Sequence, residues 1–213
     1  MSVHRLAGPL FLLAAIIAST TAVRGQDPSP AAWLQDALTA ASTPKPTIVL
    51  VDGVSADATN WKYIVPILQK DGYNVVAVEN RLSSLSEDVA TTKRVIDSAN
   101  GRVVLVGHSY GGAVITGIAA NPRIKALVYI AALAPDANEP IYGQTIAFPA
   151  WRSIRSWYLV SRDDQTINAD LQRFFARRMR ATTSEVQESR VAFISRPNTV
   201  AQLIEEAAAA NRK

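Results

Sequence analysis

The chain has 213 residues, of which 48% are hydrophobic and 19% are charged, a composition typical of one globular domain. It contains no cysteine, which excludes disulfides, thiolate metal sites and a cysteine nucleophile. The formal net charge is +4, but without residues 1–25 it falls to 20 basic against 18 acidic residues. Charge therefore gives little reason to expect an anionic partner such as nucleic acid.

The first 25 residues are predicted to form a secretory signal peptide. His4 and Arg5 give a short basic start, and an apolar run follows over residues 9–18. This run is shorter than the roughly 20 residues that span a bilayer, and small residues after it allow cleavage after Ala22 or Gly25. We expect an exported protein, periplasmic or secreted, with no stable membrane insertion after cleavage. An uncleaved membrane anchor is the alternative.

Residues 26–45 are predicted to be an N-terminal lead-in with one possible helix, and residues 46–213 a single domain. In this domain, continuous apolar runs alternate with helical patterns, and such runs are typical of strands buried on both faces of a parallel sheet. The predicted strands are Thr47–Val51, Asn74–Val78, Arg102–Val106, Ala126–Ala131, Trp157–Val160 and roughly Thr182–Val186. The predicted helices are Trp61–Lys70, Leu85–Ser98, Ser109–Ala120, Ala169–Arg180 and Thr199–Ala210.

This alternation predicts an α/β fold with a mostly parallel central sheet of about six strands and helices on both faces. The segment from Asp136 to Arg155 has no clear periodicity and carries Pro140 and Pro149, so we expect an irregular loop there. The helix predicted at 169–180 also carries a basic cluster. We interpret this cluster as a solvated face rather than a nucleic-acid site. Its members are Arg173, Arg177, Arg178 and Arg180.

The strongest motif is the segment 107–112, Gly-His-Ser-Tyr-Gly-Gly, which follows a predicted strand and precedes a predicted helix. It matches G-x-S-x-G in the strand–turn–helix context that this motif requires. The turn is so tight that side chains at Gly107 and Gly111 would collide with neighbouring backbone. Ser109 is the predicted nucleophile, and the Tyr110 N–H is predicted to face a developing oxyanion. A chance glycine-rich turn in another doubly wound domain is the alternative.

Two further loops fit the same chemistry. The segment Asp52-Gly53-Val54 follows the first strand, where this architecture obtains its second oxyanion donor, here the Val54 N–H. Asp164 follows a later strand and comes after the nucleophile in chain order, as expected of a triad acid. Taken alone, an aspartate before a helix is also a common N-cap, so that alternative stays open.

Together these segments resemble a family of small bacterial α/β-hydrolases related to plant methylesterases and hydroxynitrile lyases. The resemblance runs from about Pro46 to Ala209 and is carried by TIVLVDGVSADATNW, LVGHSYGGAVITG, ALVYIAALAPD and SWYLVSRDDQTI. It implies hydrolysis of a small carboxylic ester through an acyl-Ser109 intermediate. It also implies Asp164 as the acid and the Val54 and Tyr110 amides as the oxyanion hole. We expect no cofactor and no metal, and the oligomeric state stays open.

The chain departs from this family in three places. Members usually have His-Gly after the first core strand, where this chain has Asp52-Gly53. They usually carry the catalytic histidine before the final helix, where this chain has Arg190. They also carry a helical lid of several tens of residues, where this chain has only the short segment from Asp136 to Arg155.

The histidine count bears on catalysis. The chain has two histidines, His4 in the predicted signal peptide and His108 directly before the nucleophile. A residue in the latter position normally points away from the serine hydroxyl, so His108 is a poor general base. Arg190 cannot replace the base, because its pKa lies above ~12 and it stays protonated. We therefore expect strongly impaired ester hydrolysis. The alternative is a degenerate hydrolase that binds a small molecule or has no catalytic role.

Asp52 and Arg190 both stand where the resembled family has histidines near the nucleophile. An acid and a base introduced together predict an ion pair, with Asp164 as a competing partner for Arg190. Such a pair would fill the site and make it rigid. The alternative is that Arg190 extends into solvent.

Overall fold

The computed structural model describes Ser29 and residues 44–54, 58–118 and 121–210. The predicted signal peptide and the possible helix in the lead-in lie outside these residues, so both stay predictions. In the part of the chain that is described, no helix is long and apolar enough to cross a membrane.

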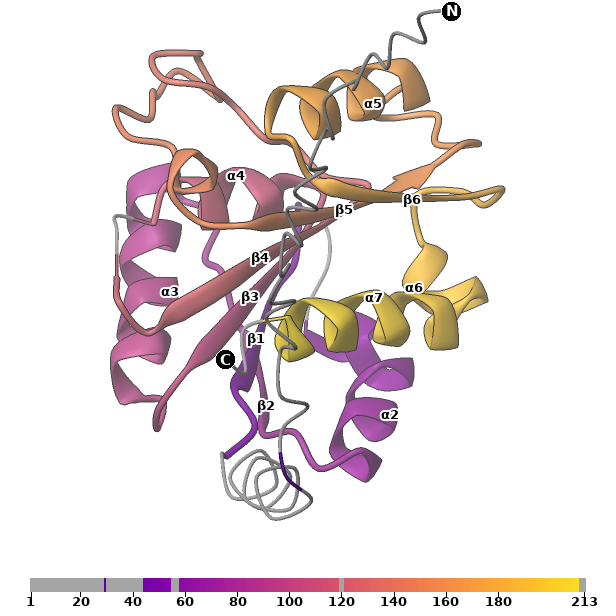
Figure 1. The fold of residues 1–213 in the computed structure, drawn as a ribbon. Helices are drawn as coiled ribbons and strands as arrows, with labels where there is room; N and C mark the ends of the chain where they lie inside the picture. Colours follow the sequence, from indigo (N-terminus) through magenta and orange to yellow (C-terminus); the bar gives the residue numbers. More distant parts are fainter. Residues whose placement is uncertain (1–28, 30–43, 55–57, 119–120, 211–213) are drawn as a thin grey trace, which may run out of the picture. The chain divides into compact units, whose positions relative to one another are not determined.

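Six strands form one sheet in the order β2-β1-β3-β4-β5-β6, and every neighbouring pair is parallel (Figure 1). This confirms the predicted α/β fold class, and the sheet is parallel throughout. The bounds are β1 Thr47–Val51, β2 Val75–Val78, β3 Val103–His108, β4 Ile124–Ile130, β5 Ser156–Ser161 and β6 Thr182–Val186. β6 lies at one edge of the sheet, and most of its side chains are exposed and polar.

Helices cover both faces of the sheet (Figure 1). Side chains of β3 alternate between two apolar layers: Val103 and Leu105 pack beneath α3, α4 and α5, whereas Val104 and Val106 pack beneath α2, α6 and α7. Burial on both faces explains why this strand is a continuous apolar run. The helices are α2 Val65–Lys70, α3 Leu85–Ser98, α4 Tyr110–Thr116, α5 Ala169–Arg178, α6 Ala192–Ser195 and α7 Pro197–Ala209, with 3₁₀ turns η1 Ala58–Tyr63 and η2 Ala150–Arg152.

The first predicted helix, Trp61–Lys70, is split in the structure. Its beginning forms the 3₁₀ turn η1, and α2 starts only at Val65, with Pro66 in its first turn. Proline has no N–H and clashes inside a helix, but it is accepted in the first turn. α3 has the predicted bounds, because Ser84 caps it by accepting a hydrogen bond from the Glu87 N–H at 3.2 Å.

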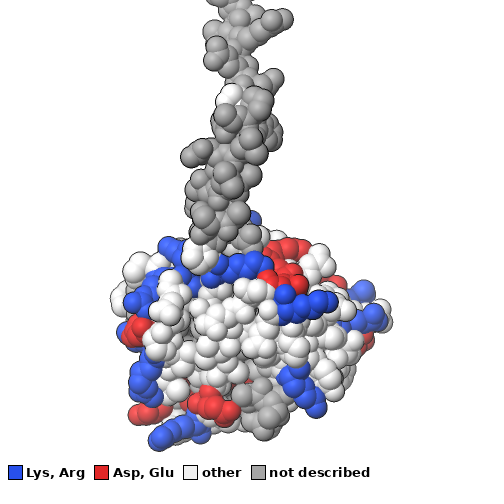
Figure 2. All heavy atoms as spheres, turned by 90° about the horizontal axis from the view of Figure 1, so that it is seen from below, with Lys and Arg blue, Asp and Glu red and all other residues white. Residues whose placement is uncertain are grey.

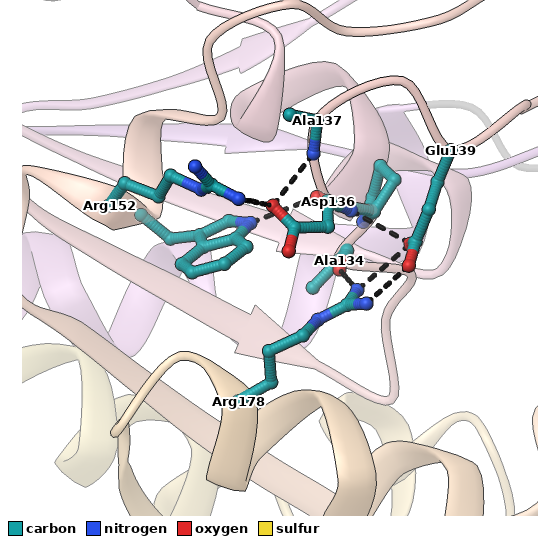
Figure 3. A network of polar contacts seen from close by, with 8 residues as sticks. Ala134, Asp136, Ala137, Glu139, Arg152 and Arg178 are labelled. Carbon is teal, nitrogen blue, oxygen red and sulfur yellow. Dashed lines mark hydrogen bonds and ion pairs between the residues drawn. The ribbon is translucent and has the colours of Figure 1, made fainter.

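The segment from Asp136 to Arg155 contains little regular structure, as predicted: one antiparallel bridge joins Ile141 to Gln144, and η2 follows. Polar contacts nevertheless fix its ends (Figure 3). Arg178 of α5 binds Glu139 and the Ala134 carbonyl, and Asp136 binds Arg152 at 2.6 Å. Arg178 is therefore not part of a solvated face, because its guanidinium is largely buried under this segment.

Candidate active site

Ser109 occupies the tight turn between β3 and α4, as the motif predicts. Its φ of 56° and ψ of −123° lie in a region that L residues rarely adopt. The Ser109 carbonyl accepts hydrogen bonds from the Leu133 N–H at 2.9 Å and the Gly112 N–H at 3.1 Å. These bonds hold the strained corner in place. A strained, well-supported residue of this kind is typical of a functional site.

Three glycines allow the backbone to approach this corner closely. A Cβ atom at Gly111 would lie 2.2 Å from the Val51 carbonyl oxygen, and one at Gly107 would lie 2.7 Å from the Gly111 carbonyl oxygen. A Cβ atom at Gly53 would lie 2.7 Å from Ser109 Oγ. The loop after β1 therefore lies directly against the predicted nucleophile, which is where a second oxyanion donor is needed.

The Ser109 hydroxyl is bound by an arginine. Arg190 Nη2 donates a hydrogen bond to Ser109 Oγ, and Ser109 is only 2% exposed. Arg190 comes from the segment between β6 and α6 and is itself partly buried. Among the residues that the structure describes, no imidazole or carboxylate is hydrogen-bonded to this hydroxyl.

His108 is directed away from Ser109, as the sequence predicts. Its Nδ1 lies 2.7 Å from Asp52 Oδ1, and its Nε2 lies 3.2 Å from the Arg190 carbonyl oxygen. The imidazole is buried and packs edge-on against Phe193, with ring centroids 4.7 Å apart. Because both ring nitrogens are already engaged, His108 is not placed to accept the Ser109 proton.

The ion pair predicted for Arg190 is not formed with either aspartate in the described part of the chain. Asp52 pairs with His108, and its carboxylate also accepts hydrogen bonds from the Gly53 N–H at 2.7 Å and from Asn60 Nδ2 at 3.1 Å. These three donors lie next to the buried carboxylate, so its acceptor sites are filled without Arg190. The predicted solvent-exposed alternative is not observed either, since Arg190 contacts Ser109.

Asp164 closes a local turn before α5. Its Oδ1 accepts from the Thr166 N–H at 2.7 Å and the Ile167 N–H at 3.0 Å, and its Oδ2 accepts from Gln172 Nε2 at 3.0 Å. The N-cap alternative is not observed, because α5 is capped by Asn168. The carboxylate is 5% exposed, and its role as a triad acid stays a prediction.

Val54 and Tyr110, the predicted oxyanion donors, line a cavity of about 300 Å³. The rest of its wall is mixed: Leu82, Leu85 and Tyr142 are its apolar and aromatic part, and Ser83, Ser84 and Gln144 its polar part. A second cavity of about 290 Å³ lies beside it and shares Leu85 and Gln144 with the first. Both residues therefore line a cavity next to the turn around Ser109, and the oxyanion role of their N–H groups stays a prediction.

Sequence reasoning missed Asp88, which is fully buried beneath this cavity. Its carboxylate accepts hydrogen bonds from the Tyr110 hydroxyl at 3.0 Å and the Leu82 N–H at 3.1 Å. Burial and the contact with Asp88 raise the pKa of Tyr110 above its ordinary value. Helical spacing from Leu85 and Ile96, both buried, places Asp88 on the inner face of α3, so the signal was available in the sequence.

Within the described residues, no group of three or more His, Cys, Asp or Glu side chains is arranged to hold a metal ion. The polar groups that surround Ser109 are a guanidinium, backbone amides and, one residue away, a His–Asp pair. Such a site can stabilise negative charge, while none of the described residues is hydrogen-bonded to Ser109 Oγ as a base.

Known proteins include relatives in sequence and in fold. Among curated proteins, the carbendazim hydrolyzing esterase of Nocardioides sp. (strain SG-4G) is 51% identical over 41 residues, which are 18% of this chain and 17% of that esterase. A pyrethroid hydrolase from Sphingobium faniae JZ-2 has a TM-score of 0.70 at 16% identity, covering 78% of this chain and 98% of the other. Tomato methylketone synthase I, complexed with 2-tridecanone, has a TM-score of 0.66 at 14% identity, covering 78% of this chain and 99% of the other.

At these identities, the likeness to the solved structures concerns the fold alone. The family match goes further, because residues 26–147, more than half of the chain, match the model of the alpha/beta hydrolase family. This range includes the strained corner at Ser109 and the loop from Asp52 to Val54. On this match, the chain belongs to the alpha/beta hydrolase family.

Proposed function

We propose that this protein is an exported serine hydrolase that cleaves small carboxylic esters slowly, through an acyl-Ser109 intermediate. Family membership and the short match to an esterase support the reaction class. The strained turn supports Ser109 as the nucleophile. Export is supported by the basic start and apolar run of residues 1–25.

The observation that carries the slow rate is the Arg190 hydrogen bond to Ser109 Oγ. Attack on an ester carbonyl requires that the hydroxyl lose its proton to a base. A guanidinium is a donor only and stays charged, so it cannot take this proton, although it can stabilise an alkoxide once one forms. In the family that the sequence resembles, a histidine stands before the final helix. We propose that Arg190 replaces it and that segment 136–155 replaces the helical lid.

In this mechanism, hydroxide removes the Ser109 proton, and Oγ attacks the ester carbonyl. The N–H groups of Val54 and Tyr110 stabilise the resulting oxyanion. The tetrahedral intermediate then collapses, the ester C–O bond breaks, and the departing alkoxide takes a proton from water to leave as the alcohol. Hydroxide attacks the acyl-enzyme in the same way, which releases the carboxylate, and the Ser109 alkoxide regains a proton from water. In serine proteases that have lost the triad histidine, binding and the oxyanion hole leave roughly 10³–10⁴-fold acceleration over water. We expect a rate of this order.

The test measures p-nitrophenyl acetate hydrolysis and fluorophosphonate labelling for the wild type, Ser109→Ala and Arg190→His. We expect slow wild-type reactions that Ser109→Ala abolishes. The wild-type rate should rise with pH without a plateau near neutrality, whereas Arg190→His should react at least about tenfold faster at pH 7 because a neutral imidazole is a base. Equal rates for the wild type and Ser109→Ala would refute the proposal.

A second candidate function is small-molecule binding without catalysis. The same contact favours it, since a permanently charged group covers the hydroxyl and the described residues supply no base. A wild type that neither labels nor hydrolyses, together with a gain in Arg190→His, would support this function over slow catalysis.

A further inference from the structure

The charge of Arg190 has no carboxylate partner in the described part of the chain. Four other arginines in the described part each form an ion pair with a carboxylate. They are Arg152, Arg173, Arg178 and Arg196. Arg190 instead donates one hydrogen bond, to the neutral Ser109 hydroxyl. A guanidinium has five N–H donors, so most of its hydrogen-bonding capacity is left for a ligand.

The other polar groups at this point suit an anion as well. The Ser109 hydroxyl can donate once Arg190 occupies its lone pair, and the turn brings the Tyr110 N–H next to Gly53. The carboxylate of Asp52, in the loop that lies against Ser109, is engaged by His108 and Asn60, and the predicted triad acid Asp164 is engaged by backbone N–H groups and Gln172. The local charge at the hydroxyl is therefore positive. A carboxylate accepts such donors with short, charge-assisted bonds.

An apolar space adjoins these donors. Tyr110 and Val54 belong to the turn region and also line the cavity of about 300 Å³, whose wall continues with Leu82, Leu85 and Tyr142. Tyr142 is 73% exposed, so the mouth of the cavity carries an aromatic ring in contact with water. The adjoining cavity of about 290 Å³ extends the space along α3. The apolar side chains Leu82 and Leu85 and the Tyr142 ring favour a ligand with an apolar tail.

We propose that this site binds monocarboxylic acids with an apolar tail, the carboxylate at Arg190 and Ser109 and the tail in the groove beside Tyr110. This inference shares with the proposed function the site at Ser109 and the adjoining cavity. Binding of a carboxylate there requires no catalysis, so the inference does not depend on the proposed reaction. It also names the chemical class that hydrolysis of a small ester would release. A product held in this way would slow turnover further.

The experiment titrates the full-length protein with octanoate and with octanamide at pH 7 in a calorimeter. These two ligands have the same tail and differ in charge. We expect octanoate to bind at least about tenfold more tightly than octanamide, as charge-assisted hydrogen bonds imply. Arg190→Gln should remove this difference. Arg94→Gln, which removes an exposed arginine on α3, should preserve it.

Equal affinities for octanoate and octanamide, or an octanoate affinity that Arg190→Gln leaves unchanged, would overturn the inference. The comparison of the two ligands needs no variant, so the inference stays testable even if Arg190→Gln does not fold. Ser109→Ala separates the two proposals, since it should end hydrolysis and weaken octanoate binding by removing one donor, whereas the charge of Arg190 should still make octanoate bind more tightly than octanamide. Hydrolysis without octanoate binding refutes only this inference, and binding without hydrolysis refutes only the proposed catalysis.

Discussion

Ser109 and His108 both contact residue 190, the first through the arginine side chain and the second through the main-chain carbonyl. The carbonyl contact is itself supported by the Asp52 carboxylate on the other side of the imidazole. The end of β3, the loop after β1 and the segment before α6 therefore meet in one buried cluster. Such a network makes the geometry around Ser109 depend on a residue, Asp52, that does not contact its hydroxyl.

The first prediction concerns this buried pair. Asp52→Ala leaves the buried His108 ring without its carboxylate partner, and leaving a buried donor unsatisfied typically lowers the free energy of unfolding by about 1–3 kcal/mol. Asp163→Ala, at an exposed position, should change it by less than about 0.5 kcal/mol. Urea unfolding of both variants measures the difference. A loss below about 1 kcal/mol for Asp52→Ala would mean that the pair contributes little.

At the scale of elements, the segment from Asp136 to Arg155 depends on charge rather than on regular structure for its position. Arg178 of α5 reaches Glu139 and the Ala134 carbonyl, and Arg152 binds Asp136 (Figure 3). Hydrogen bonds from Arg178 hold the pKa of Glu139 below its ordinary value. Burial raises the pKa of Asp136, but bonds from the Ala137 N–H and Arg152 outweigh it and leave the pKa lowered.

The second prediction follows from these lowered pKa values. A carboxyl group whose folded pKa is depressed contributes stability that is complete above its unfolded pKa, 4.5 for Glu139, and is lost as the pH falls through the folded value. Amide hydrogen exchange in residues 136–148 should therefore become faster, relative to exchange in the sheet, as the pH falls below about 4.5. Arg178→Met should show the quicker exchange already at pH 7, with Arg94→Met as the control. Identical exchange in Arg178→Met and the wild type would contradict the ion-pair explanation.

The sequence predicts these elements well where local patterns decide the structure. Apolar runs locate the first five strands to within a few residues, and the Ser84 cap fixes the start of α3. The sixth strand, also located, is mostly polar because it lies exposed at the edge of the sheet. Pro66 accounts for the split of the first predicted helix, and its position was readable in the sequence. The partners of Asp52 and Arg190 were not readable, because they depend on which way His108 turns between segments far apart in the chain.

At the scale of the whole molecule, the sheet buries two tyrosines in the layer beneath α4. The Tyr129 and Tyr158 rings are parallel, with centroids 5.9 Å apart. The Tyr129 hydroxyl lies 3.0 Å from the Thr116 hydroxyl, and the Tyr158 hydroxyl binds the Ala132 backbone. Burial raises the pKa of both phenols above the ordinary value. In contrast to this buried layer, the face of the molecule in Figure 2 carries Lys and Arg interspersed with Asp and Glu around an uncharged centre.

The third prediction is sensitivity to alkali. A phenol whose folded pKa is raised contributes stability that is complete below its unfolded pKa of about 10 and is lost as the pH rises toward the folded value. Each buried tyrosine should lower the free energy of unfolding by about 1.4 kcal/mol per pH unit above this point. Urea unfolding between pH 8 and about 11 measures the slope, and Tyr129→Phe should reduce it.

Leu127→Ala serves as the control for this slope, because it removes buried apolar volume and no titratable group. It should lower stability by about 2–5 kcal/mol at every pH and leave the slope unchanged. If Tyr129→Phe has the wild-type slope, the alkaline loss arises elsewhere in the molecule.

The edge strand β6 affects how readily two molecules of this protein can pair at high protein concentration. Four of its five side chains are threonine, serine or glutamate. Arg173 donates two hydrogen bonds to the Glu185 carboxylate, at 2.8 and 2.7 Å. Polar and charged side chains on an open margin make it a poor template for a neighbouring chain. We therefore expect the β6 edge of the sheet to resist edge-to-edge pairing with another molecule.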